Sequence, residues 1–433
     1  MKANKYLKDF IKYTLLNVLG MIGLSCYILA DTFFISKGLG SKGLAALNIA
    51  LPAYSLISGC GLMLGMGGAT KYSVEKSKGK QDEANKVFTN VLITAVLCGA
   101  LFVLIGLFFS GYIAELFGAD SDTFSMVNTY MKVLFIFAPA FIMNNIFNCF
   151  VRNDGDPNLA MTAMLVGCGF NIVFDYILIF PAKLGMFGAV LATGFSPIVG
   201  MLILSRYLIK KKNSFHLVKL KPDFKIIGSI TALGFPSLIT ELASGLVIIV
   251  FNMIFLRQQG NLGVAAYGVI ANISLVIISV YTGIAQGVQP LLSHTHGKGD
   301  SKNCRRLLKY ALLTVCVVSF IVYLGIFILA NPIVRVFNSE NNMALQSMAV
   351  YGLKIYFTAI LFVGINIVIS IFFTSTEKAL PAQIISLLRG LIVIIPIAFL
   401  LSSVGGVTGT WLAFPVTEAI VTVVAAVTYF VKR

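Results

Sequence analysis

Long apolar stretches separated by short polar segments run along the whole chain. A helix of about 20 apolar residues is long enough to cross the hydrocarbon core of a membrane. The pattern predicts twelve such helices, near residues 10–36, 44–70, 87–112, 124–150, 158–180, 184–208, 226–256, 262–292, 306–332, 344–374, 380–403 and 405–431. We therefore expect an all-α polytopic membrane protein.

The composition agrees with this class. Of the 433 residues, 58% are hydrophobic and 12% are charged, and the mean hydropathy is +0.90, which lies outside the range of soluble globular domains. No nucleotide-binding motif, redox centre or catalytic triad is visible in the sequence. We expect neither an enzyme nor a cofactor.

Basic residues are spread unevenly over the segments between the spans. One alternate set of segments, which includes both ends of the chain, holds 24 of the 33 Lys and Arg residues, whereas the other set holds five. Basic segments favour the cytoplasmic side of a membrane. We expect a plasma-membrane protein with both termini in the cytoplasm, and we explain the net charge of +16 by this topology rather than by nucleic-acid binding.

The sequence pattern predicts two related halves of the chain. A basic polar stretch, RYLIKKKNSFHLVKLKPDFK at residues 206–225, lies midway. A shift of 221 residues places Tyr130 on Tyr351 and Gly185 on Gly406. This predicts an N-terminal lobe at 1–210, a linker at 211–225 and a C-terminal lobe at 226–433, with six helices in each lobe and a pseudo-two-fold axis along the membrane normal.

Two aspartates within the predicted spans point to function. A carboxylate at the centre of a membrane helix costs roughly 2.5 to 3.5 kcal/mol, so such residues usually serve an ion, a proton or an aqueous cavity. The 221-residue shift sets Asp31 against Asn252 and Asp175 against Pro396, so only the first half carries these acids. A structural alternative is that each acid caps a broken helix or bonds a neighbouring backbone.

Two further oxygen-bearing side chains accompany them. Asn171 and Asp175 are four residues apart and share a helix face, and Thr193 lies at a comparable depth in the next span. Together with Asp31 they predict a site for H+ or Na+. For Asn171 and Thr193 alone, ordinary interhelical hydrogen bonding explains the residues equally well.

A second group of polar residues is assigned to substrate contact: Glu241, Asn145, Asn252 and Gln286. Glu241 lies deep within its predicted helix, where it would either bind a substrate cation or pair with a buried base such as Lys354 or Arg389. Glu418 in the last span is a similar but weaker candidate.

Several motifs resemble the multidrug and toxic compound extrusion (MATE) family of cation-coupled antiporters: YILADTFFIS, FNCFVRNDGDPNLAM, NIVFDYILIF, GAVLATGFSP and GIAQGVQPLLSHTHGKGD. The resemblance covers essentially the whole chain. It implies a cation site at Asp31, Asn171, Asp175 and Thr193. The chain departs from many prokaryotic relatives in one respect, because TLLNVLGMIG in helix one lacks their early proline.

The resemblance implies export of amphipathic or cationic drug-like compounds. Together with the residues above, it predicts a secondary active antiporter that exports such compounds in exchange for inward H+ or Na+, by alternating access of two lobes. Its partners would be small molecules and membrane lipids, and we expect a monomer. The first alternative is a lipid-linked saccharide flippase of the same wider superfamily, for which more membrane-embedded bases than Lys132, Lys354 and Arg389 are expected. The second is a channel or a membrane scaffold.

Overall fold

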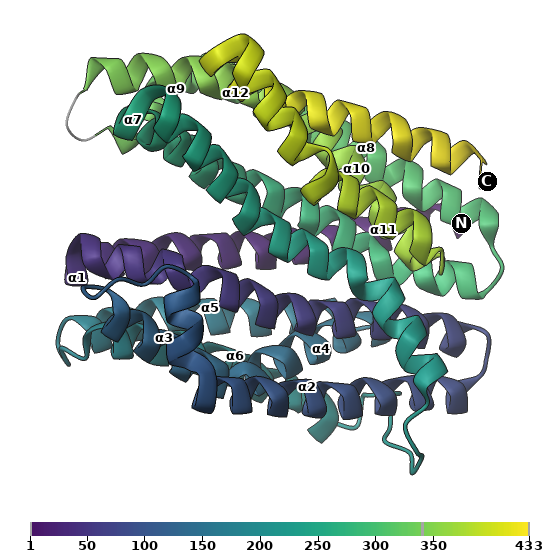
Figure 1. Ribbon diagram of the computed structural model, residues 1–433. Helices are drawn as coiled ribbons and strands as arrows, with labels where there is room; N and C mark the ends of the chain where they lie inside the picture. The colour runs from purple at the N-terminus through teal and green to yellow at the C-terminus, as the bar shows by residue number, and fades with distance from the viewer. Residues whose placement is uncertain (1, 339–341, 432–433) are drawn as a thin grey trace. The chain divides into compact units, whose positions relative to one another are not determined.

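The computed structural model describes residues 2–338 and 342–431 and shows helices throughout (Figure 1). The elements, in chain order, are α1 (Lys2–Ser77), α2 (Gln81–Leu116), α3 (Phe124–Ile136), α4 (Ala138–Asp154), α5 (Pro157–Ile179), α6 (Gly185–Ile209), α7 (Phe224–Gly297), α8 (Ser301–Phe337), α9 (Met343–Tyr356), the 3-10 turn η1 (Phe357–Ala359), α10 (Ile360–Ser375), α11 (Ala379–Leu387), the π-helical turn η2 (Leu388–Ile392) and α12 (Ile394–Val431). The all-α class predicted from the sequence is confirmed.

Twelve membrane-spanning segments can be counted in the described part of the chain. Eight continuous helical stretches are long and apolar enough to cross a membrane, and the bent pair α3 and α4 makes a ninth. Three of the nine are broken at a glycine with non-helical backbone angles, Gly40 in α1, Gly260 in α7 and Gly406 in α12. Each break divides one stretch into two spans, which gives the predicted number.

The break glycines recur at the period of the predicted duplication. Gly185 and Gly406, which are 221 residues apart, have φ of 58° and 55°. Gly40 and Gly260 share angles near φ 67°, ψ −160° and φ 61°, ψ −150°, but are 220 residues apart. Positive φ is readily adopted only by glycine. The second half therefore repeats the backbone turns of the first, with a shift of one residue at the first break.

Contacts divide the chain into two compact units that differ from the predicted lobes, because each unit includes the start of a long helix from the other half. Unit 2 comprises Leu15–Leu242 and Ser293–Asp300, and unit 1 comprises the residues up to Thr14, Ala243–Leu292 and the chain from Ser301 onward. The start of α1 thus packs with the second half, and the start of α7 packs with the first. A division into lobes at the linker 211–225 stays a prediction, since the contact units are not separated there.

Within unit 2, the last turns of α1 and the exchanged start of α7 approach each other at a reciprocal pair of glycines. A Cβ atom added to Gly67 would lie 2.0 Å from the carbonyl oxygen of Ile230, and one added to Gly234 would lie 1.8 Å from that of Met63. Such contacts allow the two backbones to touch. Gly61 and Gly65 of α1 lie against Asn145 of α4, where an added Cβ atom would lie 3.0 Å from Asn145 atoms.

Unit 1 contains a buried ion pair that the sequence did not predict. The Nε atom of Arg389 donates to Oε1 of Glu418 at 2.6 Å, and Nδ2 of Asn366 donates to Oε2 at 2.7 Å. Thr422 Oγ1 completes the cluster with a bond of 3.1 Å to Asn366 Oδ1. Arg389 lies in η2, a π-helical turn of the type that re-aims a side chain within a helix. Glu418, only 1% exposed, is therefore neutralised by a base of its own unit.

We predict opposite effects for two glycine-to-alanine substitutions. Gly234→Ala should lower stability by about 1–3 kcal/mol, because the added methyl group meets backbone atoms that have to move. Gly169→Ala, on α5 with no atom within 4 Å of the added Cβ, should raise stability slightly. Thermal unfolding of the purified protein, followed with a thiol-reactive dye on its free cysteines, measures both. Equal shifts for the two variants would contradict the close approach.

We also predict strong coupling between Arg389 and Glu418. Glu418→Ala should cost about 3–5 kcal/mol, because it leaves a buried guanidinium without its counter-charge. Combining it with Arg389→Met should recover part of the loss in the same unfolding assay. As a control, Glu83→Ala removes an exposed pair with Lys86 and should leave the melting temperature nearly unchanged. Additive effects of the two buried substitutions would show that the pair does not stabilise unit 1.

Candidate functional site

The four residues predicted for the cation site lie together inside unit 2. Asp31 comes from α1, Asn171 and Asp175 from α5, and Thr193 from α6. Their relative exposures are 7%, 0%, 0% and 3% in that order, so the side chains are withdrawn from the surface. Helix α5 packs closely against α6, and this packing brings Thr193 against the face that carries Asn171.

Asn171 is the link between the carboxyl group and α6. With its amide turned so that both polar atoms have partners, Nδ2 donates to Asp175 Oδ2 at 2.8 Å and Oδ1 accepts from the Thr193 backbone N–H at 3.2 Å. The opposite orientation leaves only a 3.4 Å contact from Nδ2 to Thr193 Oγ1. The first orientation satisfies the buried amide better. It fixes one oxygen of Asp175.

The Asp31 and Asp175 carboxyl groups are within hydrogen-bonding reach of each other. Oδ1 of each has no hydrogen-bond partner in the described residues. Two adjacent carboxylates in a medium of low dielectric constant repel each other, so a pair at this separation holds a shared proton or a cation. The described residues contain no cluster of three or more His, Cys, Asp or Glu side chains suited to a metal ion. Such a carboxyl pair can bind a proton or a single small cation.

Two buried tyrosines, Tyr27 and Tyr130, and the half-buried Tyr54 border the site, and the sequence analysis did not assign them to it. Tyr130 of α3, 3% exposed, lies beside the Thr193 side chain. Tyr27, one helical turn before Asp31, shares a hydrogen bond of 3.0 Å with Tyr54 Oη. The only sequence signal that pointed to Tyr130 was its match with Tyr351 under the 221-residue shift. This signal misleads, because Tyr351 is 49% exposed.

The residues assigned to substrate contact do not fall in one unit. Asn145 and Glu241 belong to unit 2, whereas Asn252 and Gln286 belong to unit 1. Asn145 Nδ2 makes a long bond of 3.4 Å to the Ser58 carbonyl oxygen. Their role in binding therefore stays a prediction. The suggested pairing of Glu241 with Arg389 finds no support, since Arg389 bonds Glu418 instead.

Helix one has no break between Lys2 and Gly40, as the missing proline suggests. Two glycines in this stretch, Gly20 and Gly23, face α5. A Cβ at Gly20 would lie 3.1 Å from Met164 Sδ, and one at Gly23 would lie 2.5 Å from Leu165 Cδ2. Both glycines thus allow close contact with α5, the helix that carries Asp175.

The chain is similar to known transport proteins over almost its whole length. Residues 18–177 and 236–400 match the MatE family. The multidrug export protein MepA of Staphylococcus saprophyticus is 27% identical over 430 residues, which cover 98% of this chain and 94% of the relative. MepA of Staphylococcus aureus is also 27% identical, over 432 residues and the same shares.

Solved structures share the fold at 22% sequence identity. An outward-facing multidrug resistance MATE transporter of the MOP superfamily superposes with a TM-score of 0.92, over 98% of this chain and 95% of that one. A MOP superfamily transporter from Pyrococcus furiosus, described as having a binding pocket of reversed polarity that suggests a different function, gives 0.91 over the same shares. At this identity the likeness establishes the fold alone. The family match, in contrast, covers most of the chain, and the protein belongs to the MatE family of membrane transporters.

Proposed function

We propose that the protein is a cation-coupled antiporter that exports amphipathic or cationic drug-like compounds. Inward movement of a proton or Na+ through the site at Asp31, Asn171, Asp175 and Thr193 would drive export by alternating access. The two MepA relatives are multidrug export proteins, which supports small molecules as the substrate class. We place the protein in a prokaryotic plasma membrane as a monomer with both termini in the cytoplasm, in accordance with the distribution of its basic residues.

One observation carries this proposal, the contact between two buried carboxyl groups in unit 2. A coupling ion can drive a conformational cycle only if its affinity differs between conformations or between substrate-loaded and empty states. Asp31 lies on α1 and Asp175 on α5. A movement of either helix would separate the carboxyl groups and change the affinity for the ion, which is the property that coupling requires.

The surroundings of the pair favour a proton over Na+. Na+ requires several oxygen ligands around one position, as hard cations do. In the better-satisfied orientation, however, Asn171 presents its Nδ2 donor to Asp175 and its Oδ1 to the Thr193 backbone. Thr193 Oγ1 lies 3.1 Å from the Ala189 carbonyl oxygen, to which it donates. A carboxyl pair that shares one proton needs no further ligands.

The flippase alternative gains no support from the membrane-embedded bases. Arg389 is bonded to Glu418, and the Lys354 ammonium lies 4.6 Å from the centroid of the Phe327 ring. A lipid-linked saccharide with a phosphate group calls for a cluster of uncompensated cations. Among these bases, one is already neutralised by a carboxylate.

The first prediction of this proposed function concerns drug accumulation in cells. Asp175→Asn should raise the level of a fluorescent cationic dye to that of cells without the protein, because an amide cannot release a proton. A protonophore should have the same effect on the wild type. Asp122→Asn, which changes an acid on the surface of the same unit, 63% exposed, should leave export intact. Full export by the Asp175 variant would exclude this residue from coupling.

The second prediction separates the two ions. In proteoliposomes, a pH gradient alone should drive uptake or release of the dye, whereas a Na+ gradient at equal pH on both sides should not. The reason is that the carboxyl pair accommodates a proton without additional oxygen ligands. If Na+ drove transport at constant pH and Asp31→Asn abolished it, the proposed site would stand but the coupling ion would be Na+.

A further inference from the structure

The linker between the halves is fixed in place on unit 2. We call residues 211–225 the strap; residues 212–223 are non-helical, and the last residues begin α7. The Phe215 side chain is 1% exposed. Its ring packs against four aromatic rings, with centroid distances of 4.6 Å to Phe88, 5.8 Å to Phe150, 6.1 Å to Tyr72 and 6.2 Å to Tyr207.

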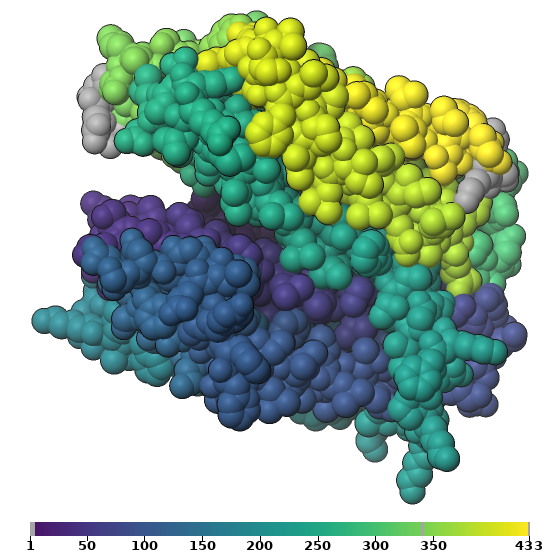
Figure 2. Space-filling view, viewed as in Figure 1, coloured from purple at the N-terminus to yellow at the C-terminus, as the bar shows by residue number. Residues whose placement is uncertain are grey.

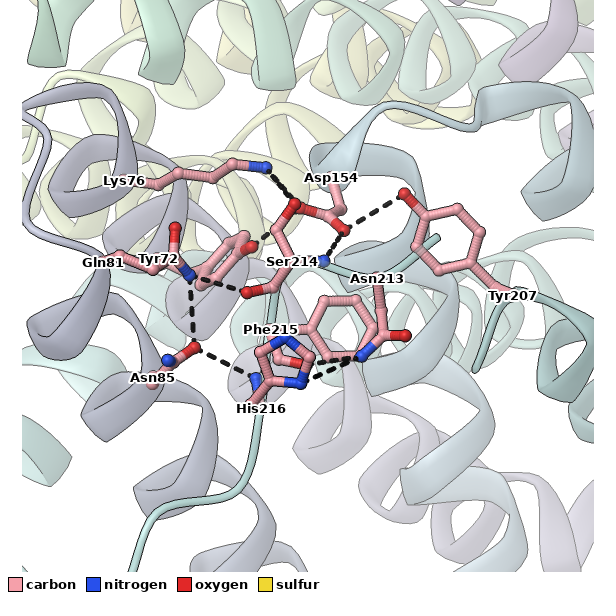
Figure 3. Close-up of polar contacts among 10 residues, drawn as sticks. All are labelled: Tyr72, Lys76, Gln81, Asn85, Asp154, Tyr207, Asn213, Ser214, Phe215 and His216. Carbon is pink, nitrogen blue, oxygen red and sulfur yellow. Dashed lines mark hydrogen bonds and ion pairs between the residues drawn. The ribbon is translucent and has the colours of Figure 1, made fainter. Parts of the chain in front are cut away.

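Asp154, at the end of α4, holds the beginning of the strap (Figure 3). Its buried carboxylate accepts from the Ser214 backbone N–H at 2.7 Å. It also accepts from Lys76 Nζ at 2.5 Å, Tyr72 Oη at 2.7 Å and Tyr207 Oη at 3.1 Å. Charge-assisted bonds of this kind are among the strongest in proteins. The strap therefore starts from a rigid point.

The remainder of the strap follows the surface of α2. Successive backbone groups of the strap bond to polar side chains of that helix. Gln81 Nε2 donates to the Ser214 carbonyl oxygen at 2.6 Å. The backbone N–H groups of His216, Val218 and Asp223 donate to Asn85 Oδ1 at 3.0 Å, Thr89 Oγ1 at 3.1 Å and Asn90 Oδ1 at 2.9 Å, respectively. The first three of these α2 residues are spaced by four and lie on one helix face. Figure 2 shows the strap region, in teal, at the surface of the molecule.

The outer side of this fixed segment combines bases with large apolar groups. Leu217 is 67% exposed and Phe224 is 83% exposed. All five lysines are exposed as well, against a single acid, Asp223; these are Lys211, Lys212, Lys219, Lys221 and Lys225. Hydrogen bonding and packing of the strap explain the inward groups but not two large apolar side chains held outward among lysines.

The position along α2 places this surface at the edge of the hydrocarbon layer. The last strap contact is at Asn90, and the exposed large apolar residues of α2 begin at Val96 and Leu97. Six residues of helix correspond to roughly 9 Å. This is close to the depth of the headgroup region, which adds about 5–8 Å on each side of the hydrocarbon core.

We propose that the strap is a docking surface for anionic lipid headgroups, with Leu217 and Phe224 inserted at the interface. Charge complementarity selects this partner, because juxtamembrane lysine clusters attract the anionic lipids of the cytoplasmic leaflet, and apolar groups among lysines are typical of interfacial binding. The bonds to Asp154 and α2 hold the backbone of the strap in place, so lipid binding costs little conformational entropy. This inference is independent of the proposed transport cycle.

The test uses a fluorescent reporter in the full-length protein. Phe224→Trp is reconstituted in bilayers that contain brominated phosphatidylglycerol or brominated phosphatidylcholine, whose bromine atoms quench a nearby indole. The signal of the native buried Trp411 is measured without the reporter substitution and subtracted. We expect quenching to indicate at least about fivefold tighter binding of the anionic lipid. The ratio of the affinities for the two lipids should fall to about one when three lysines are replaced together, with Lys219→Gln, Lys221→Gln and Lys225→Gln.

A matched control removes the same number of charges from another exposed basic segment, with Lys302→Gln, Arg305→Gln and Lys309→Gln on α8. These substitutions should leave the preference unchanged. Equal quenching by the two lipids, or an equal loss in the control, would overturn the proposal. Absence of quenching by either lipid would also overturn it and indicate that the strap faces a soluble partner. Dye export by the same variants reports on transport separately, so failure of one proposal does not imply failure of the other.

Discussion

The cost of an unpaired polar group in hydrocarbon underlies the arrangement of both units. With no water available in the membrane, each charged or amide side chain has to find its partner within the protein. Glu418 meets this requirement completely, since its two carboxylate oxygens are bonded to Arg389 and Asn366. Asp31 and Asp175 meet it only in part, because one oxygen of each has no hydrogen-bond partner in the described structure. A balanced ion pair stabilises a fold, whereas an incompletely satisfied acid pair retains the capacity to exchange an ion.

The two halves of the chain repeat glycine breaks at corresponding positions and differ in chemistry. Gly185 and Gly406 have nearly the same positive φ, which is consistent with a repeated turn before the last span of each half. Tyr130 and Tyr351 occupy equivalent sequence positions, yet the first is buried beside Thr193 and the second is exposed with Thr408 as its partner. Steric limits on backbone angles hold for both halves, but only one of them has to enclose a carboxyl pair.

The fold neighbours illustrate why function has to be argued from the site. A multidrug resistance transporter and a transporter whose pocket is said to suggest a different function superpose equally well on this chain. Helix packing is common to both, and the side chains within the packing decide what is carried. For this protein the distinguishing features are the carboxyl pair of unit 2, the neutralised base of unit 1 and the lysine-rich strap.

The sequence by itself determined the class and the number of spans, and it predicted the repeat and a functional role for the membrane acids. These follow from local properties: apolar length, the conformational freedom of glycine and the energetic cost of a carboxylate in a helix. It could not determine that Asp31 meets Asp175, that Tyr130 borders them, or that Arg389 neutralises Glu418 rather than Glu241. It also did not reveal that the start of α7 packs with unit 2 or that the linker is bonded to α2. Only the tertiary structure decides these, because they depend on contacts between helices distant in the chain, and a helix face visible in sequence does not specify which helix it will meet.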